Sequence, residues 1–536
     1  MQRFAQLLDS LVYTQSRNRK LDLLGAYFRD TPDPDRGWAL AALTGGLPIR
    51  FPLRRILGDI LTDIIDPDLY KMSRDYVGDT AETVSLLWPD QPGTRSTPPS
   101  LSDVVTTFSN TPPNAQAPIL KDMLNQLDTS GRFALLKLLG GAPRVGVSAR
   151  LAKQSLAKVF ETDINDIEEV WHAVDPPFEN LFAWLENKAP RPDPGLKPVF
   201  RPLMLAHPIE DEDWPNLNPE DIVAEWKWDG IRVQVAAKPT EVRIYSRTGD
   251  EITHAFPEIA SAFTGLDCVA DGELLIMRDG IVAPFNDLQQ RLNRKTVSAR
   301  IQRDFPAHVR LYDLLIDEAT DLRKLPFADR RAQLENWIAQ HNPSRTDLSD
   351  LVTFNDFEHL QEIWEATRAE EIEGLMLKQK QSPYLAGRPK GHWWKWKRAP
   401  LTIDCVMMYA QRGSGKRSSF YSDYTFGVWK DGTPEDPALG ELVPVGKAYS
   451  GFTDEELTRL DKFIRNNTTD RFGPVRAVKP ELVLEIAFDA VQPSPRHKSG
   501  IAMRFPRIAR IRWDKPAEDA DTLEAIEALL PSASTP

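Results

Sequence analysis

Residues 225 to 232 read Glu-Trp-Lys-Trp-Asp-Gly-Ile-Arg, and the rest of the chain is organised around this stretch. The apolar run 222–224 before it predicts a strand, and the Asp-Gly pair predicts a tight turn. The alternating apolar positions of 231–235 predict a second strand, so we expect the two strands to form a β-hairpin. Lys227 would then lie on a rigid element beside the turn.

A lysine amine is a nucleophile only when it is uncharged, and its ordinary pKa is about 10.4. A site that uses Lys227 as a nucleophile must therefore lower that pKa with nearby cations or by excluding water. The alternative is a surface hairpin that carries an ordinary lysine. The short stretch leaves both interpretations open, and the motifs that follow it in the chain decide between them.

The bulk composition limits the class of protein. A chain of 536 residues predicts roughly three domains. The two cysteines, Cys268 and Cys405, are too few for a disulfide framework or a four-cysteine zinc site, and their apolar surroundings predict core positions. A net charge of −12 argues against a nucleic-acid partner, although a local basic surface can override the total.

Targeting and membrane signals are not found in the sequence. The N-terminus does not resemble a signal peptide, and no apolar run reaches the roughly 18 residues that a membrane-spanning helix needs. We therefore expect a soluble protein of the cytoplasm with no membrane association.

The first 200 residues are predicted to be helical. Apolar residues follow helical spacing between Phe4 and Val12 and between Leu120 and Leu127, and a further helix near 133–139 should end at Gly140-Gly141. Prolines then crowd the stretch from Lys188 to Pro202, which predicts a linker between domains.

A basic segment stands at the end of this helical region. Residues 144–148 read Arg-Val-Gly-Val-Ser and precede a helix that contains Arg150, Lys153 and Lys158. Small residues and backbone amides at a helix start can hold a phosphate. A helix connection with a solvated basic face explains the same residues equally well, and both interpretations stay open.

Residues 201–400 mix short strands with helices and carry acidic residues in apolar strands. Glu273 follows Asp271-Gly272, and a buried glutamate is costly unless it is paired or binds a cation. Glu373 opens a second apolar strand, Arg247 closes another, and Tyr312 stands within a third. Arg247 suits a phosphate or a turn, and Tyr312 suits a nucleobase or the core.

Residues 393–397 read Trp-Trp-Lys-Trp-Lys. In a strand, Lys395 and Lys397 point to one face, and Trp394 and Trp396 point to the other. Two ammonium groups on one face repel, so a shared anion is the favoured explanation. An edge strand that uses lysines to prevent aggregation is the alternative.

Residues 401–536 are predicted to form a small barrel, with strands near 403–410, 426–429 and 482–491. The basic loop 412–417 lacks the spacing of a phosphate loop. Four arginines and one lysine crowd residues 504–515, and the interleaved apolar residues indicate a strand, on which Arg510 and Arg512 would share a face. Such a cationic strip suits a polyphosphate.

The order of these motifs resembles that of the ATP-dependent DNA ligases, within the lysine nucleotidyltransferases that also include RNA ligases and mRNA capping enzymes. The resemblance covers residues 225–515, and the helical first 200 residues are similar, more loosely, to the DNA-binding domain of these ligases. It implies a multidomain α+β chain: an all-α DNA-binding domain (1–200), an α+β nucleotidyltransferase (adenylation) domain (201–400) and a C-terminal OB-fold β-barrel (401–536). One departure is Tyr312, where many relatives have Phe.

The resemblance also implies a chemistry. Lys227 would attack the α-phosphate of ATP, AMP would pass to the 5′-phosphate of a nick, and the 3′-hydroxyl would displace it during DNA repair, replication or recombination. The implied roles are Glu225 orienting the nucleotide, Arg232 and Arg247 binding phosphates, Glu273 and Glu373 holding Mg²⁺ or Mn²⁺ (Glu273 alternatively the ribose), Tyr312 stacking on adenine, Lys395 and Lys397 neutralising the α-phosphate, and Arg510 and Lys515 reaching the pyrophosphate.

The implied partners are ATP and nicked double-stranded DNA, bound by a monomer in a bacterial cytoplasm. Because Arg510 and Lys515 are so distant from Lys227 in sequence, their domain would have to close over ATP and reopen for DNA. The alternatives are an RNA ligase or another lysine nucleotidyltransferase, and a catalytically inactive nucleic-acid-binding scaffold. The missing four-cysteine zinc module disfavours an NAD-dependent ligase.

Overall fold

The computed structural model describes residues 1–49, 51–90, 98–141, 143–193, 195, 197–292, 294, 296–367, 372–398, 400–413, 421–430, 440–449, 454–494 and 497–530. The chain divides into two compact units. The middle unit consists of residues 156–398, and the other unit combines a helical part (1–155) with a β-rich part (399–536).

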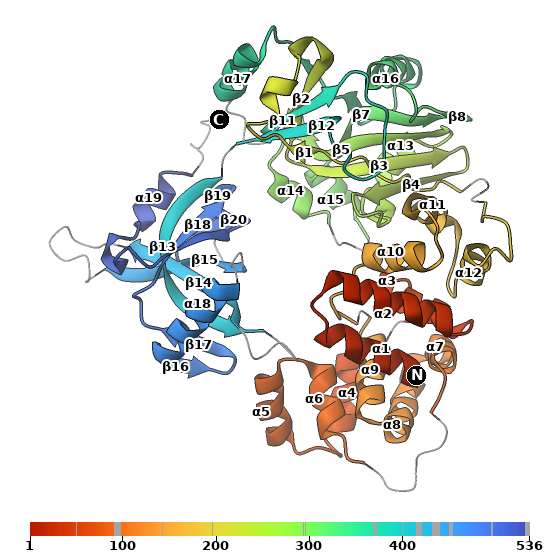
Figure 1. The fold of residues 1–536 in the computed structure, drawn as a ribbon, viewed down its shortest axis with the longest axis vertical. Helices are drawn as coiled ribbons and strands as arrows, with labels where there is room; N and C mark the ends of the chain where they lie inside the picture. Colours follow the sequence, from red (N-terminus) through yellow and green to blue (C-terminus); the bar gives the residue numbers. More distant parts are fainter. Residues whose placement is uncertain are drawn as a thin grey trace. The chain divides into compact units, whose positions relative to one another are not determined.

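The helical part confirms the predicted helices. Asp128 caps α9 by accepting from the Gly131 amide, and the helix ends at Leu139 before Gly140, where the sequence placed its end. Ser100 and Asp103 cap α7 in the same way. The helices are α1 (Gln2–Tyr13), α2 (Arg17–Asp30), α3 (Asp35–Thr44), α4 (Leu53–Leu61), α5 (Pro67–Val77), α6 (Thr80–Leu87), α7 (Leu101–Asn110), α8 (Gln116–Gln126), α9 (Thr129–Leu139) and α10 (Ala149–Val159) (Figure 1).

Residues 156–200 group with the middle unit, although the sequence placed them in the first domain. They contain α11 (Ile164–Val170) and α12 (Glu179–Leu185). Glu169 of α11 binds Arg323 at 2.5 Å and Arg191 at 3.1 Å. The first ion pair ties α11 to a turn near residue 323, later in the middle unit, and the second ties it to the proline-rich segment after α12.

Two mainly antiparallel sheets build most of the middle unit. One has the order β1-β12-β11-β2-β10, with β1 running parallel to β12, and the other has the order β4-β3-β5-β7-β8, with β6 on β5 and β9 on β7. The strands are β1 (His207–Pro208), β2 (Ile222–Trp228), β3 (Ile231–Lys238), β4 (Glu241–Ser246), β5 (Cys268–Arg278), β6 (Ile281–Val282), β7 (Ala307–Asp317), β8 (Thr320–Asp321), β9 (Thr346–Leu348), β10 (Leu351–Val352), β11 (Ile372–Gln379) and β12 (Trp393–Lys397).

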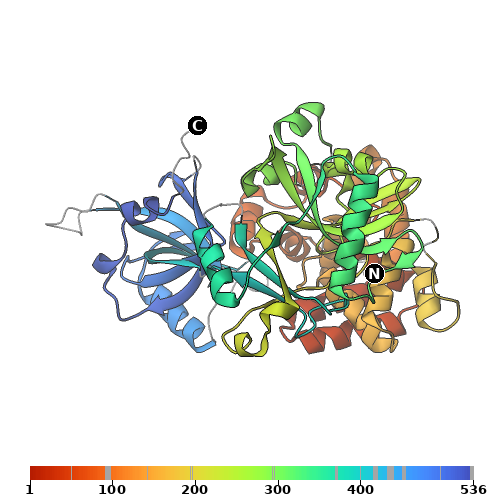
Figure 2. The same ribbon diagram turned by 90° about the horizontal axis from the view of Figure 1, so that it is seen from above.

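Apolar residues from both sheets pack into one core cluster. Val269 and Leu315 come from one sheet, and Trp393 comes from the other. Helix α16 (Phe327–His341) packs against β7, and Figure 2 shows it lying across the middle unit. The remaining helices are α13 (Pro257–Ala262), α14 (Phe285–Gln289), α15 (Ala299–Asp304) and α17 (Phe357–Ala366).

The predicted β-hairpin around Asp229-Gly230 is wrong, although both of its strands exist. β2 pairs with β10 and β11, whereas β3 pairs with β4 and β5. The turn therefore carries the chain from one sheet to the other. Local sequence predicts a strand and a turn, but the choice of partner strand depends on residues more than a hundred positions away.

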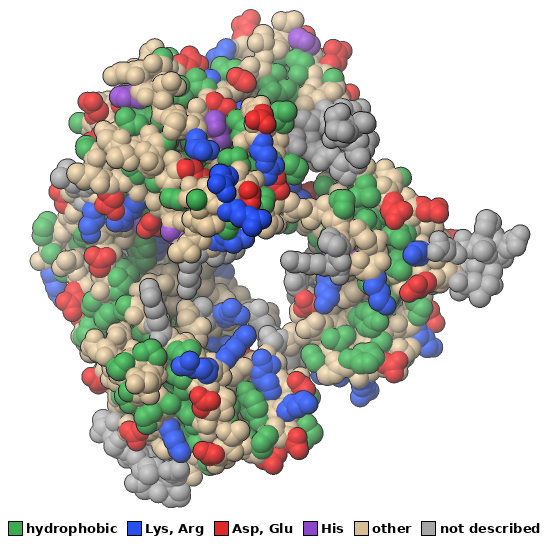
Figure 3. All heavy atoms as spheres, turned by 180° about the vertical axis from the view of Figure 1, so that it is seen from behind, with side chains coloured by type: hydrophobic (Ala, Val, Ile, Leu, Met, Phe, Trp, Pro, Cys, Tyr) green, Lys and Arg blue, Asp and Glu red, His purple; other side chains and the backbone are tan. Residues whose placement is uncertain are grey.

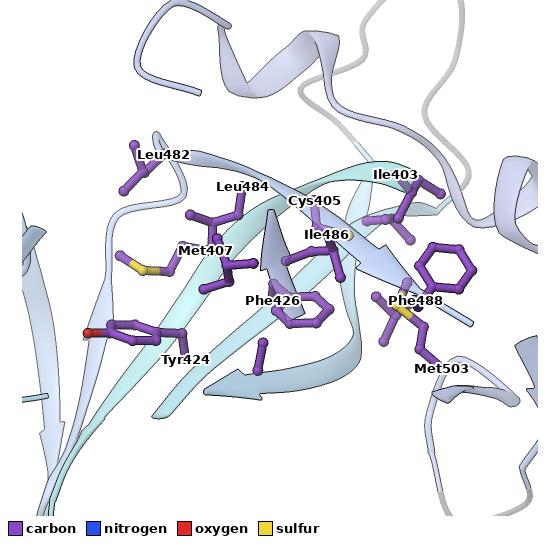
Figure 4. Close-up of a cluster of buried hydrophobic side chains, with 14 of the residues drawn as sticks. Ile403, Cys405, Met407, Tyr424, Phe426, Leu482, Leu484, Ile486, Phe488 and Met503 are labelled. Carbon is purple, nitrogen blue, oxygen red and sulfur yellow. The ribbon is translucent and has the colours of Figure 1, made fainter. Parts of the chain in front are cut away.

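The β-rich part closes five strands into a ring. β13 pairs with both β14 and β18, and β15 and β21 complete the circuit between them. Figure 4 shows apolar side chains such as Ile403, Phe426 and Ile486 filling its interior. The elements are β13 (Leu401–Arg412), β14 (Tyr421–Lys430), β15 (Glu441–Tyr449), α18 (Asp454–Asn466), β16 (Thr468–Phe472), β17 (Val475–Val478), β18 (Val483–Phe488), β19 (Ala490–Pro493), β20 (Ile501–Arg504), β21 (Arg507–Arg512) and α19 (Leu523–Glu527).

Both cysteines are buried and unbridged, as predicted, since Cys268 and Cys405 lie in apolar core clusters. The basic loop predicted at 412–417 lies outside the described residues from position 414 onward. Among the helices of the described ranges, none combines the length and apolar character that a membrane span needs.

Candidate active site

Lys227 lies near the end of β2, where the chain crosses between the two sheets of the middle unit. Its ammonium donates a hydrogen bond to Glu373, and its side chain is 24% exposed. The crossing is tight, because a Cβ on Gly230 would lie 2.5 Å from the carbonyl oxygen of Leu274. The two sheets thus fix the Lys227 backbone while its amine stays accessible.

A β-bulge turns Glu373 toward Lys227. In the pairing of β11 with β2, Ile372 faces Trp228 and Gly374 faces Lys227, so Glu373 is the extra residue. A bulge re-aims the side chain that it displaces. A Cβ on Gly374 would lie only 2.1 Å from the carbonyl oxygen of Trp396, so glycine permits the close approach of β11 and β12.

Glu373 is held between two ammonium groups. Its carboxylate accepts from Lys227 and lies 3.0 Å from the Lys397 ammonium. Burial would raise the pKa of Glu373, but the charges and hydrogen bonds of these two lysines outweigh burial and lower the pKa to about 2. Glu373 therefore stays ionised at neutral pH.

Lys395 and Lys397 share one face of β12, as the sequence predicted. Lys397 pairs with Gly374 and Lys395 pairs with Met376 of β11, on the face that carries Lys227. Trp394 and Trp396 pack into the core cluster on the opposite face.

Several cations converge on Lys395. Partial burial lowers the pKa of Lys395, and the charges of Arg388, Lys397, Arg247 and Lys227 lower it further. Arg247 and Arg388 are both exposed. Lys227 and Lys397 share the carboxylate of Glu373, and Lys395, Arg247 and Arg388 add three further cations, so the geometry suits a bound polyanion.

Glu273 lies on β5, opposite Arg232 of β3. Burial raises the pKa of Glu273 to about 7, although Lys227 and Arg232 oppose the rise and the charges of Glu373 and Asp229 add to it. Within the described part of the chain, the Glu273 carboxylate forms no hydrogen bond. Glu273 and Glu373 thus occupy one electrostatic cluster with Lys227.

A second bulge places Tyr312. β7 changes register against β5 between Leu311 and Asp313, which leaves Tyr312 as the extra residue. The Lys378 ammonium lies 4.7 Å from the centre of its ring, and the Arg232 guanidinium lies 5.6 Å from it.

Arg232 is bound mainly by the protein itself. Its Nη2 donates to Asp271 at 2.7 Å, and its Nη1 donates to the carbonyl oxygen of Met204 at 2.6 Å. Asp271 is fully buried and also accepts from Tyr384 at 2.5 Å and from Gln234 at 2.9 Å. Both terminal nitrogens of Arg232, which the sequence predicted to bind phosphate, are therefore held by other groups of the protein.

Glu225 lies two positions before Lys227 on the same face of β2, and it is 2% exposed. It accepts from Lys378 of β11 at 2.8 Å. Lys378 was not among the site residues predicted from the sequence. The signal was present, because strand alternation places Lys378 on the face of Gly374 and Met376, but that face points to the site only once β11 is paired with β2.

The last two predicted residues, Arg510 and Lys515, lie in the β-rich part. Arg510 is exposed on β21, whose Ile508 and Ile511 are buried, which confirms the predicted strand. Lys515 follows the strand and donates to Asp404 at 2.8 Å. These residues belong to the other compact unit, whereas Lys227 belongs to the middle unit.

The basic segment of the helical part lines an open pocket of about 830 Å³. Arg144 and Gly146 have positive φ angles of 53° and 69°, and they lie beside Arg17, Lys20 and Arg150. Figure 3 shows Lys and Arg side chains gathering over the helical part and over the middle unit, despite the net charge of −12.

Comparison with protein families gives two matches. The model described as "ATP dependent DNA ligase domain" matches residues 203–397, and the model described as "ATP dependent DNA ligase C terminal region" matches residues 417–515. The first range contains the Lys227 cluster, and the second contains Arg510 and Lys515.

Similar curated proteins carry the same description. A "Probable DNA ligase" of Koribacter versatilis is 30% identical over 99% of this chain and 96% of its own length. A "Probable DNA ligase" of Saccharopolyspora erythraea is 33% identical over 77% of this chain and 78% of its own. A solved structure named Pmar-Lig_Pre, 16% identical, covers 96% of this chain and 99% of its own with a TM-score of 0.61, which shows a shared fold.

Proposed function

Since this chain belongs to the ATP-dependent DNA ligase family, we propose that Lys227 is the residue that carries AMP during the sealing of nicked DNA. The observation that carries this proposal is the Lys227 amine, which is partly exposed at the junction of two sheets, bonds to Glu373 and lies within electrostatic range of Lys395. The family acts on nicked DNA with ATP, which also decides against an RNA ligase and against an inactive scaffold.

The proposed reaction has three steps. The Lys227 nitrogen attacks the α-phosphorus of ATP, and the bond to pyrophosphate breaks. The 5′-phosphate of the nick then attacks the same phosphorus and releases Lys227. Finally the 3′-hydroxyl attacks the 5′-phosphorus and expels AMP. Because phosphoryl transfer depends mainly on positioning and charge neutralisation, the protein needs an anchored amine and many cations.

Lys395 and Lys397 are proposed to neutralise the α-phosphate, since they share the face of Lys227. Arg247 is proposed to bind a phosphate of the nucleotide or of the nick, because it is exposed within range of Lys395. Arg232 stays a proposed nucleotide-binding residue: its terminal nitrogens bind Asp271 and Met204, and its buried Nε, which has no partner among the described residues, is a donor left for a ligand.

Tyr312 is proposed to stack on the adenine ring, and Glu225 is proposed to orient the same base. The bulge that displaces Tyr312 from the regular strand supports its role. Stacking of a base on an aromatic side chain contributes about 1–3 kcal/mol.

Glu273 and Glu373 are proposed to hold Mg²⁺, for which Mn²⁺ could substitute. No cluster of three or more His, Cys, Asp or Glu side chains suited to a metal occurs among the described residues, so the two glutamates would share the cation with phosphate oxygens and water. The raised pKa of Glu273, about 7, supports this role, because a partly buried carboxylate is stabilised in its charged form by a cation. When bound, the cation would neutralise charge on the phosphates.

The β-rich part is proposed to be an OB-fold, because its five strands form a closed ring. Arg510 and Lys515 are proposed to contact the leaving pyrophosphate, which requires their domain to close over ATP. The helical part is proposed to bind DNA phosphates at the pocket lined by Arg17, Arg144 and Arg150, so binding should be salt-dependent and independent of sequence.

The test uses the whole protein with α-labelled ATP and Mg²⁺. We expect covalent label on Lys227, none on Lys227→Ala, and sealing of nicked DNA in preference to nicked RNA. Undiminished label on Lys227→Ala would show that the nucleophile lies elsewhere.

A further inference from the structure

Lys378 is a lysine buried inside the middle unit, with only 1% of its side chain exposed. It lies on β11 opposite Trp393 of β12 and opposite Val223 of β2. Its ammonium donates to Oε2 of Glu225 at 2.8 Å. Lysine is almost never fully buried unless it is paired. An aliphatic side chain would fill the same space without the cost of burying a charge, so the charge of Lys378 points to a role beyond packing.

Three aromatic rings surround the Lys378 ammonium. The ring centres of Tyr312, Phe327 and Trp393 lie 4.7, 4.6 and 4.7 Å from Nζ. The attraction of a cation to aromatic faces offsets part of the hydration that burial removes. Tyr312 is the ring proposed to stack on the base, so Lys378 and the nucleobase would share one aromatic neighbour.

The second oxygen of Glu225 is buried, and no hydrogen bond to it occurs among the described residues. Arg331 lies close to this oxygen, with its Nη1 3.7 Å away, but donates instead to the carbonyl oxygen of Ser349 at 2.8 Å. A buried carboxylate oxygen without a donor is costly. An incoming ligand that donates a hydrogen would remove that cost.

We propose that Lys378 is a positioning residue that holds Glu225 charged and oriented, so that its second oxygen accepts the 6-amino group of adenine and rejects a 6-oxo purine. This inference rests on the proposed function, in which Glu225 orients the nucleotide. It adds the residue that makes the orientation selective.

The chemistry follows from the partners. A carboxylate oxygen attracts an amino group and repels the oxygen of a 6-oxo purine. Burial raises the pKa of Glu225, and the Lys378 ammonium is the largest influence that opposes the rise. Without Lys378 the carboxyl would bind a proton more readily, and a protonated carboxyl can donate to a 6-oxo group.

The experiment compares ATP with inosine triphosphate, which carries a 6-oxo group in place of the 6-amino group. The label transferred to the whole protein gives kcat/KM for each nucleotide in the native protein, Lys378→Met, Glu225→Gln and the double variant. We expect the ATP-to-inosine ratio to fall about tenfold or more in each single variant, as for the loss of one charged hydrogen bond. Because both residues act through one oxygen, the double variant should show no further fall.

The control is Glu258→Gln, which disturbs another buried ion pair of the middle unit, that with Arg291. It should lower the melting temperature and leave the nucleotide ratio unchanged. If Lys378→Met does not fold, Lys378→Gln is measured under the same criterion, since it also removes the charge. A folded Lys378 variant with the native ratio, or additive effects in the double variant, would overturn the proposal. Absence of label on the native protein with either nucleotide would instead overturn the proposed function.

Discussion

The Glu373 carboxylate accepts a hydrogen bond from the Lys227 ammonium across 146 positions of sequence, because a bulge in β11 turns it toward the end of β2. Its pKa of about 2 makes it a permanent negative charge at neutral pH. Such a group cannot store the proton that Lys227 must lose before it attacks. Glu373 can orient the amine and attract a cation, and these two roles lead to the first prediction.

Glu373→Gln should slow the labelling of Lys227 by about a hundredfold or more, because an oriented charged group at a phosphoryl-transfer site is lost. The rate of label transfer from α-labelled ATP measures the effect. Glu362→Gln, on the exposed surface of α17, serves as a control and should react at the native rate. An unchanged rate in Glu373→Gln would remove this glutamate from the site.

Gly374→Ala should lower the free energy of unfolding by about 1–3 kcal/mol or more, since the new methyl group would clash with the Trp396 carbonyl oxygen at 2.1 Å. Denaturant unfolding measures the loss. Gly58→Ala is the matched change, because that exposed helical glycine has open space around its Cα and should gain stability. Equal stability of the two variants would contradict the close approach of β11 and β12.

Tyr312→Phe should leave the KM for ATP close to the native value, whereas Tyr312→Leu should raise it about tenfold or more, because only the first change keeps a ring for stacking. Steady-state label transfer at varied ATP concentration distinguishes the two. A similar KM in both variants would indicate that the ring serves the core alone.

Glu273 should make the stability of the protein depend on pH. Its pKa is raised from the ordinary 4.5 to about 7, so the folded protein binds a proton that the unfolded chain releases. The contribution is present below about 4.5 and is lost as the pH rises through 7. Thermal unfolding without divalent cations should therefore show a decline over that range, and Glu273→Gln should flatten it. A decline of the same size in Glu273→Gln would assign the effect to another group.

Arg510→Ala and Lys515→Ala should each slow the formation of adenylated protein about a hundredfold, because each removes a cation from the leaving pyrophosphate. Neither should slow the sealing of a nick that already carries AMP, since that step releases no pyrophosphate. Single-turnover assays of the two steps separate these outcomes. An equal slowing of both steps would instead assign the cationic strip to DNA binding.

The positions of strands and helices were accessible from the sequence, whereas their pairing was not. Alternation placed Lys395 and Lys397 on one face correctly, because that property is local to β12. The hairpin was wrong because the partners of β2 are β10 and β11. Partner choice is a non-local property, and a turn motif carries no information about it.

The two bulges show the same limit at the level of single side chains. Regular alternation would send Glu373 to the face opposite Lys227 and would give Tyr312 an ordinary place in β7. Each is displaced only because its strand carries one more residue than the partner strand. The family motifs identified both residues, but the direction of their side chains could be known only from the register of each strand against its partner.

The crossing at Asp229-Gly230 gives the nucleotide a mechanical role. Lys227, Glu225, Lys395 and Lys397 belong to one sheet, while Glu273 and Tyr312 belong to the other. A covalently held AMP would therefore contact residues of both sheets and link the two sheets where they meet at this turn. Charging the protein with AMP would therefore stiffen the middle unit, and transfer of AMP to the nick would remove the covalent link before the final sealing step.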